Sequence, residues 1–271
     1  MIAAVGTSGG AGTRRWFAPI ALMLTGTAWL ALLLWEQSPY GRYLDHSRWT
    51  ETGLAAALCR ALPAGDVVLP AFLYAGGWLL MIAAMMLPTS LPLFRRFDRV
   101  VQGRPDRVVL LGLLTAGYLL AWAGFGLVAH LLDSALHAAA RRSDWLIGNG
   151  WALGAAVLAL AGVFQFSRLK YRCLDKCRTP LGFIVQHWRG RGPWRSAFQL
   201  GLHHGLFCVG CCWALMLLMF AVGTASVGWM LLLGAVMAIE KNAPWGARLS
   251  RPLGAALVGL AVVVAGANLL S

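Results

Sequence analysis

The chain has 271 residues, of which 59% are hydrophobic and only 12% are charged, and its mean hydropathy is +0.68. Soluble domains are close to half apolar and a quarter charged, so this composition excludes an ordinary soluble domain and indicates a multi-pass membrane protein. The formal net charge of +13 does not indicate nucleic-acid binding, because no nucleic-acid-binding motif accompanies it.

A helix that spans a bilayer needs about 20 mostly apolar residues. The sequence predicts an all-α transmembrane bundle of about seven such helices, the sixth being the shortest. In chain order they are Trp16–Trp35, Val67–Leu87, Val108–His130, Ile147–Phe166, Ala197–Val222, Ser226–Ile239 and Leu253–Leu270. Residues 1–15, rich in Gly, Ala, Ser and Thr, are predicted to be a disordered tail. Residues 16–271 then form a single membrane domain.

The basic residues predict the orientation of these helices. Most of the 23 Lys and Arg residues fall in alternate connections, namely the N-terminus, Pro88–Arg107, Ser167–Arg195 and Glu240–Pro252. Basic loops remain on the cytoplasmic side. We therefore expect the N-terminus inside and the C-terminus outside.

The second predicted helix carries methionines near its cytoplasmic end. Met81 and Met85 are four residues apart and Met86 is adjacent, so their thioethers can form part of a soft-metal shell. Such a stripe is also typical of an ordinary packed core. Pro88 and Pro92 follow, which favours the end of the helix or a kink.

A pair of cysteines follows the fourth predicted helix. Cys173 and Cys177 are four positions apart, which on a helix places both thiols on one face. Basic neighbours such as Lys170 and Arg172 favour thiolates, which suits metal capture or thiol exchange. In a cytoplasmic loop a permanent disulfide is not expected, and the pair can also be idle thiols in a basic surface helix.

The fifth predicted helix contains the sequence "GLFCVGCCWALM". Cys208, Cys211 and Cys212 share one face with His204 and Met216, near the middle of the bilayer. Soft sulfur ligands select Cu(I) first and zinc next. A monovalent ion on two thiolates keeps one negative charge, so a positive neighbour or a protonated ligand must accompany it. Thiols can also serve packing alone.

Two further features complete the candidate site. Gly201 and Gly205 lie on or beside the cysteine face and allow another helix to approach closely. Glu240 and Lys241 end the sixth helix, where they either extend to the membrane surface or place a carboxylate that handles a proton or a metal at the cytoplasmic mouth.

Four blocks of sequence resemble a known family. "MIAAMMLPTSLPLF", "FQFSRLKYRCLDKCRTPLGF", "GLHHGLFCVGCCWALMLLMFAVG" and "GWMLLLGAVMAIEK" are similar, in this order, to bacterial predicted metal-binding integral membrane proteins. This is a domain-of-unknown-function family, and some of its members carry the label copper chaperone. The resemblance covers roughly residues 72–245. The matching residues are Met81, Met85, Met86, Pro88, Gln165, Lys170, Cys173, Cys177, Pro180, Cys208, Cys211, Cys212, Trp213, Met216, Glu240 and Lys241.

These observations favour a non-enzymatic protein of the bacterial inner membrane that binds Cu(I), or another soft metal, and acts as a chaperone or transporter. The predicted metal ligands are Cys173, Cys177, Cys208, Cys211, Cys212, His204, Met81, Met85, Met86, Met216 and Glu240. Its expected partners are the lipid bilayer, the metal ion and a metal-donating or metal-accepting protein. Two alternatives stay open: a membrane thiol–disulfide oxidoreductase, since Cys208 and Cys211 form a C-x2-C pair, and a structural or assembly subunit.

Overall fold

The computed structural model describes residues 23, 25–34, 76–140, 142–143, 145, 149–188, 192–222 and 227–270. Every regular element within these ranges is a helix, which confirms the predicted all-α class. The predicted disordered tail, residues 1–15, and the Glu36–Asp66 connection lie outside the described residues.

The described helices occur in the following order along the chain. Two unlabelled helices, Thr25–Leu34 and Gly76–Met85, come first. They are followed by η3 (Pro88–Ser90), α4 (Leu91–Val100), α5 (Arg107–Ala140), α7 (Trp151–Phe164), α8 (Arg168–Arg178), α9 (Pro180–His187), α10 (Pro193–Val222), α11 (Val227–Asn242) and α12 (Gly246–Leu269).

Three of the described helices are long and apolar enough to cross a membrane. They are α5 over Arg107–Leu132, α10 over Pro193–Met219 and the whole of α12. Two bent helix pairs raise this number to five if each pair is one span. The described part of Thr25–Leu34 and the 16 residues of α11 are shorter than a span needs. The number seven and the orientation therefore stay predictions.

Both bent pairs have a local cause. Gly76–Met85 and Pro88–Val100 meet at 47°, where Pro88 and Pro92 begin η3 and α4, as the kink prediction required. The helices α7 and α8 meet at 64°. Ser167 stands between them in an extended conformation, and its hydroxyl accepts a hydrogen bond from the backbone nitrogen of Lys170 at 3.1 Å. This N-cap begins a new helix in a new direction.

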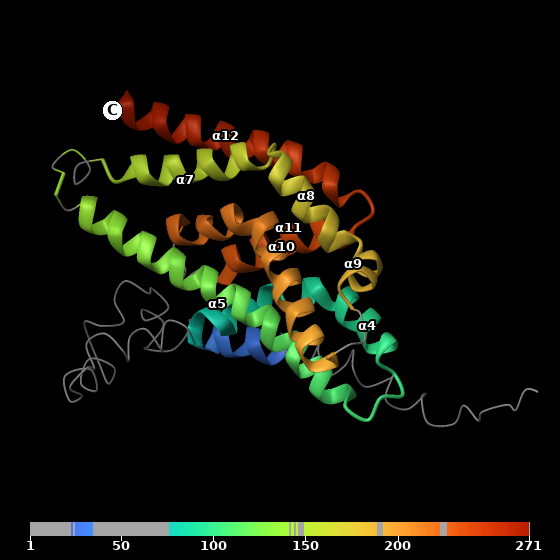
Figure 1. Cartoon of the computed structure of the whole chain (residues 1–271). Helices are drawn as coiled ribbons and strands as arrows, with labels where there is room; N and C mark the ends of the chain where they lie inside the picture. The colour runs from blue at the N-terminus through green and yellow to red at the C-terminus, as the bar shows by residue number, and fades with distance from the viewer. Residues whose placement is uncertain are drawn as a thin grey trace, which may run out of the picture.

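The helices α5 and α10 cross at glycines (Figure 1). A Cβ atom added at Gly201 would lie 2.0 Å from the carbonyl oxygen of Leu114, and one at Gly117 would lie 2.2 Å from that of Phe198. At Gly205 it would lie 2.6 Å from the Cβ of Ala121. The close approach predicted from Gly201 and Gly205 is confirmed, and α5 is the helix that approaches.

A second pair of helices, α7 and α12, lies side by side and packs through Gly162 and Gly254 (Figure 1). The short helix α11 packs between α10 and α12, and α8 packs against both α10 and α11. The cysteine-bearing stretch of α10 is therefore enclosed by its neighbours, and the core of the protein is built around it.

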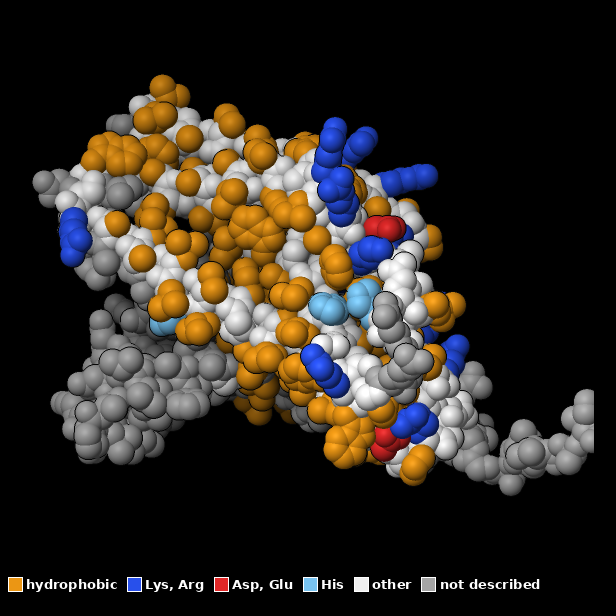
Figure 2. Space-filling view, in the orientation of Figure 1, with side chains coloured by type: hydrophobic (Ala, Val, Ile, Leu, Met, Phe, Trp, Pro, Cys, Tyr) orange, Lys and Arg blue, Asp and Glu red, His pale blue; other side chains and the backbone are white. Residues whose placement is uncertain are grey.

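The surface combines a large apolar area with a basic end, as expected of a membrane protein. In Figure 2, apolar side chains cover much of the visible face, and Lys and Arg gather mainly toward the end that carries α4, α8 and α9. Outward residues such as Val108 (81% exposed) and Val262 (65% exposed) belong to the long apolar helices α5 and α12. Such a surface suits lipid better than water.

We expect Gly201→Ala to destabilise the protein, because the new methyl group would overlap the Leu114 carbonyl and push α5 from α10. Overpacking of this kind costs about 1–3 kcal/mol. Gly124→Ala on α5 is the matched control, since nothing lies within 4 Å of its Cβ position. Thermal unfolding in detergent should show a lower Tm for Gly201→Ala alone; equal Tm values for the two variants would contradict the close crossing.

Candidate functional site

Three buried thiols lie on α10, as predicted. Cys208, Cys211 and Cys212 are all 2% exposed or less. The thiols of Cys211 and Cys212 donate to the carbonyl oxygen of Cys208 at 3.0 and 2.9 Å. These two thiols are thus held by their own helix, while the sulfur of Cys208 contacts other helices.

The Cys208 sulfur lies where several elements meet. The hydroxyl of Tyr118 on α5 is 3.2 Å from it, and the ammonium nitrogen of Lys241 on α11 is 2.9 Å from it. The same hydroxyl lies 3.2 Å from the Met86 carbonyl oxygen and accepts from Ser90 at 3.1 Å. A substitution at Cys208 would therefore alter contacts with α5, α11 and the turn after Met85.

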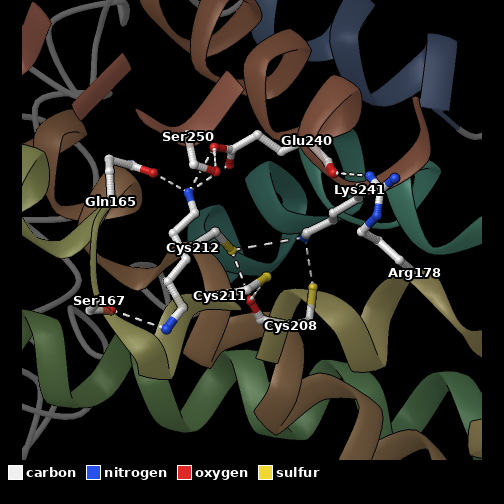
Figure 3. A network of polar contacts seen from close by, with 10 residues as sticks. Gln165, Ser167, Arg178, Cys208, Cys211, Cys212, Glu240, Lys241 and Ser250 are labelled. Atoms are coloured by element: carbon white, nitrogen blue, oxygen red, sulfur yellow. Dashed lines mark hydrogen bonds and ion pairs between the residues drawn. The ribbon is translucent and has the colours of Figure 1, made fainter. Parts of the chain in front are cut away.

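Lys241 is buried among sulfur atoms, which differs from a side chain that extends to the membrane surface. Its Nζ lies 3.6 Å from the Met86 sulfur, 3.4 Å from the Thr89 hydroxyl and 3.9 Å from the Cys212 sulfur, besides the contact with Cys208. Figure 3 shows its side chain directed at the two cysteines. This ammonium is the positive neighbour that thiolates in an apolar interior require.

The second thiol pair, on α8, comes to the same place. The thiol of Cys177 lies near enough to Cys208 and Cys211 to interact electrostatically with them. The Cys173 sulfur packs against α10, where a Cβ at Gly210 would lie only 2.7 Å from it. Cys173 is buried and Cys177 is half-buried. The two cysteine groups that the sequence could not relate to each other thus form one cluster.

A buried ion pair holds α8 in this position. The Lys170 ammonium donates to both carboxylate oxygens of Glu240 at 2.8 Å and also to the amide oxygen of Gln165. The hydroxyl of Ser250 on α12 donates to Glu240 at 2.7 Å. Lys170 and Glu240 are 0% and 2% exposed. Figure 3 shows the Glu240 side chain directed at this group and away from the cysteines.

Glu240 thus lies in the interior, and its predicted place at an open cytoplasmic mouth does not fit this position. Its backbone carbonyl accepts from Arg178, which also donates to the Pro244 carbonyl at 2.9 Å. With both carboxylate oxygens engaged by Lys170 and Ser250, the contacts of Glu240 are those of an anchoring group.

The other predicted ligands divide into two groups. His204 is buried, stacks on Tyr118 at a ring-centroid distance of 6.0 Å, and its Nδ1 has no hydrogen-bond partner among the described residues. Met86 joins the Lys241 network. Met81, Met85 and Met216 are buried in the surrounding core, and within the described ranges the hydrogen-bond network around Cys208 does not reach them.

The donor chemistry fits a soft ion of low coordination number. No three His, Cys, Asp or Glu side chains within the described ranges are grouped as a ready site for a metal. Pairs of sulfur atoms are present, with Cys177 beside Cys208 and beside Cys211, and the five described cysteines are free thiols. Two thiolates suffice for Cu(I), whereas tetrahedral zinc takes four ligands.

Several contributors were missed from the sequence. They are the polar residues Thr89, Ser90 and Ser250, the aromatic Tyr118, the buried role of Gln165, which the sequence indicated only as a family-matching residue, and the buried role of Lys170. The available signal was their polarity within apolar stretches, because polar groups inside a membrane protein face a partner. Lys170 was read as a surface neighbour of the thiols, but it is the counter-charge of Glu240.

Comparison with known proteins gives a family match over most of the chain. The model of the PpoB2 family, described as copper chaperone, matches residues 75–264. This range includes every residue of the thiol cluster and of the Lys170–Glu240 ion pair. No curated protein and no solved structure matches the chain.

We expect Lys170→Met to lower the free energy of unfolding by about 3–5 kcal/mol, because it leaves the Glu240 carboxylate buried without its cation. The double variant Lys170→Met/Glu240→Gln should recover much of this loss, since it removes both charges. Denaturant unfolding of the detergent-solubilised protein, followed by circular dichroism, measures both.

The exposed ion pair of Arg104 and Asp106 provides the control, because Arg104→Gln should change the stability little. If the double variant were as unstable as Lys170→Met, side-chain shape and not the buried charge would explain the loss.

Proposed function

We propose, since the chain belongs to the PpoB2 copper chaperone family, that it is a membrane-embedded, non-enzymatic carrier that binds Cu(I) through thiols of α8 and α10. The observation that carries this proposal is the packing of α8 on α10, which puts the Cys173 sulfur against Gly210 and Cys177 near Cys208 and Cys211. Thiols from two helices converge there beside a buried ammonium group, which suits a monovalent soft ion.

The two helices suggest a division of work. Cys173 and Cys177 follow the basic bend between α7 and α8, so these thiols would capture the ion. Cys208 and Cys211 would receive it by exchange of one sulfur at a time, which avoids a bare ion in an apolar interior. Rotation of the Cys212 side chain away from the Cys208 carbonyl oxygen would supply a further sulfur ligand.

The remaining predicted ligands would surround these thiols as weaker or supporting ligands. Met86 lies beside Lys241, and His204 presents an unpartnered buried nitrogen. Met81, Met85 and Met216 would line the surrounding core and shield the ion from other ligands. Glu240 would act by anchoring α8 through Lys170.

In the cell, we place the protein in the bacterial inner membrane with seven spans, the N-terminus inside and the C-terminus outside. The gathering of basic side chains near α4, α8 and α9 supports a cytoplasmic location of that end. The half-buried Cys177 would then meet a metal-donating or metal-accepting protein on the cytoplasmic side.

The same contacts support one rival function. Cys177 and Cys208, or Cys208 and Cys211, could exchange between dithiol and disulfide as in a membrane thiol–disulfide oxidoreductase. A copper carrier needs reduced thiols when empty, whereas an oxidoreductase cycles through a disulfide. The experiment below separates the two by measuring metal and thiols together.

We expect protein purified anaerobically in detergent and loaded with Cu(I) to hold copper, and Cys208→Ser and Cys177→Ser each to lose most of it. Serine removes the soft ligand but keeps the size of the side chain. Copper is measured by mass spectrometry and free thiols are counted on the same samples. Cys59→Ser is the control, because Cys59 lies outside the family match.

Equal copper in wild type and in both variants would remove the proposed site. Wild-type protein that holds no copper and whose thiols are oxidised in pairs would favour the oxidoreductase.

A further inference from the structure

Within the described part of the chain, no carboxylate forms an ion pair with Lys241. The buried charged side chains of the described ranges are Asp98, Lys170, Glu240 and Lys241. Asp98 pairs with Arg107 at 2.7 Å, and Lys170 pairs with Glu240 at 2.8 Å. Among the described residues, the hydrogen bonds of Lys241 go to sulfur atoms and to the Thr89 hydroxyl. Arg178, a further cation near Glu240, is half-buried and donates hydrogen bonds to two backbone carbonyls.

Of the described groups that contact Lys241, the thiols of Cys208 and Cys212 are those that can become anions. The number of thiolates then sets how much positive charge a metal can add. Two thiolates, one monovalent ion and the ammonium group sum to zero. Two thiolates and a divalent ion are already neutral, so the ammonium group would leave one uncompensated positive charge. An uncompensated charge in a buried apolar site is strongly unfavourable.

A divalent ion could restore neutrality by recruiting a third thiolate. Cys177 lies near both Cys208 and Cys211, but among the described residues no three His, Cys, Asp or Glu side chains are arranged so that they could hold a metal ion together. The thiols of Cys211 and Cys212 are turned back onto the Cys208 carbonyl at 3.0 and 2.9 Å, and recruiting either breaks that hydrogen bond. The arrangement thus favours two thiolates over three.

We propose that Lys241 is the residue that selects the charge of the bound metal: it makes the thiol cluster favour monovalent soft cations over divalent ones. This rests on the proposed function, since it requires a metal at Cys208. An N–H to sulfur hydrogen bond does not compete with metal ligation for all of the sulfur lone pairs. Lys241 therefore stays beside the cluster when the ion arrives, as a fixed positive charge.

The test uses Ag⁺, a monovalent soft ion without redox chemistry, and Cd²⁺, a soft divalent ion. The full chain is purified anaerobically in detergent, and the association constant of each ion is measured by competition with a chromophoric chelator. The variants are Lys241→Met, which removes charge and donor, Lys241→Gln, which removes the charge but keeps an N–H donor, and Lys241→Arg, which keeps the charge. Lys176→Met removes a half-exposed charge from α8 as the control.

We expect the ratio of the Ag⁺ to the Cd²⁺ association constant to fall by about tenfold or more in Lys241→Met and Lys241→Gln, because one unit charge at this distance acts in opposite senses on the two complexes. The ratio should hold within about threefold in Lys241→Arg and Lys176→Met. The Gln variant keeps the proposal testable if the Met variant does not fold.

Unchanged ratios in the neutral variants, with both ions still bound, would overturn charge selection and leave the copper site standing. Wild-type protein that bound neither Ag⁺ nor Cu(I) would instead overturn the proposed function itself. If the ratio fell as much in Lys176→Met as in Lys241→Gln, the selectivity would come from the summed electrostatic potential of the basic residues. That result would also overturn a specific role of Lys241.

Discussion

Two consecutive residues of α11, Glu240 and Lys241, each bury a charge in an apolar helical bundle, where an unpaired charge costs several kcal/mol. Consecutive residues on a helix point about 100° apart, so the two charges must be satisfied by different neighbours. Glu240 finds Lys170 on α8 and Ser250 on α12, and Lys241 finds Cys208 on α10. One turn of α11 thereby fixes the relation of three other helices.

The position of the thiols on α8 follows from the first of these contacts. Lys170, Cys173 and Cys177 are spaced by three and four residues, which places them on one face of the helix. When Lys170 is drawn to Glu240, the same face turns both thiols toward α10. The ion pair and the thiol cluster are therefore one packing arrangement, and loss of the first would loosen the second. Under the proposed function, Glu240 would therefore act by positioning α8, because its carboxylate contacts Lys170 and Ser250.

Local features of the site could be predicted from the sequence, while its tertiary pairings could not. Helical spacing alone placed Cys208, Cys211 and Cys212 on a common face, and Pro88 indicated the bend after the second helix. Gly201 and Gly205 indicated a close crossing but not that α5 is the partner. The pairing of Lys170 with Glu240 joins residues 70 positions apart, and no periodic pattern encodes such a contact. For the same reason the sequence described Lys170 and Lys241 as surface cations, because burial depends on which anion the fold supplies.

The surroundings of Cys208 come from elements that are distant in the chain, and this ties metal binding to folding. Tyr118 reaches the sulfur because glycines let α5 lie against α10, and the same hydroxyl binds the Met86 carbonyl at the bend before η3. Lys241 adds α11 and Cys177 adds α8. Because unfolding disperses these groups, a metal that bridged α8 and α10, as proposed, would bind the folded state in preference to the unfolded one and stabilise it. Under the proposed function, release of the ion would need either local separation of the two helices or entry of a competing sulfur. Separation of α8 would break the buried Lys170–Glu240 ion pair, so exchange with a competing sulfur would be the less costly route.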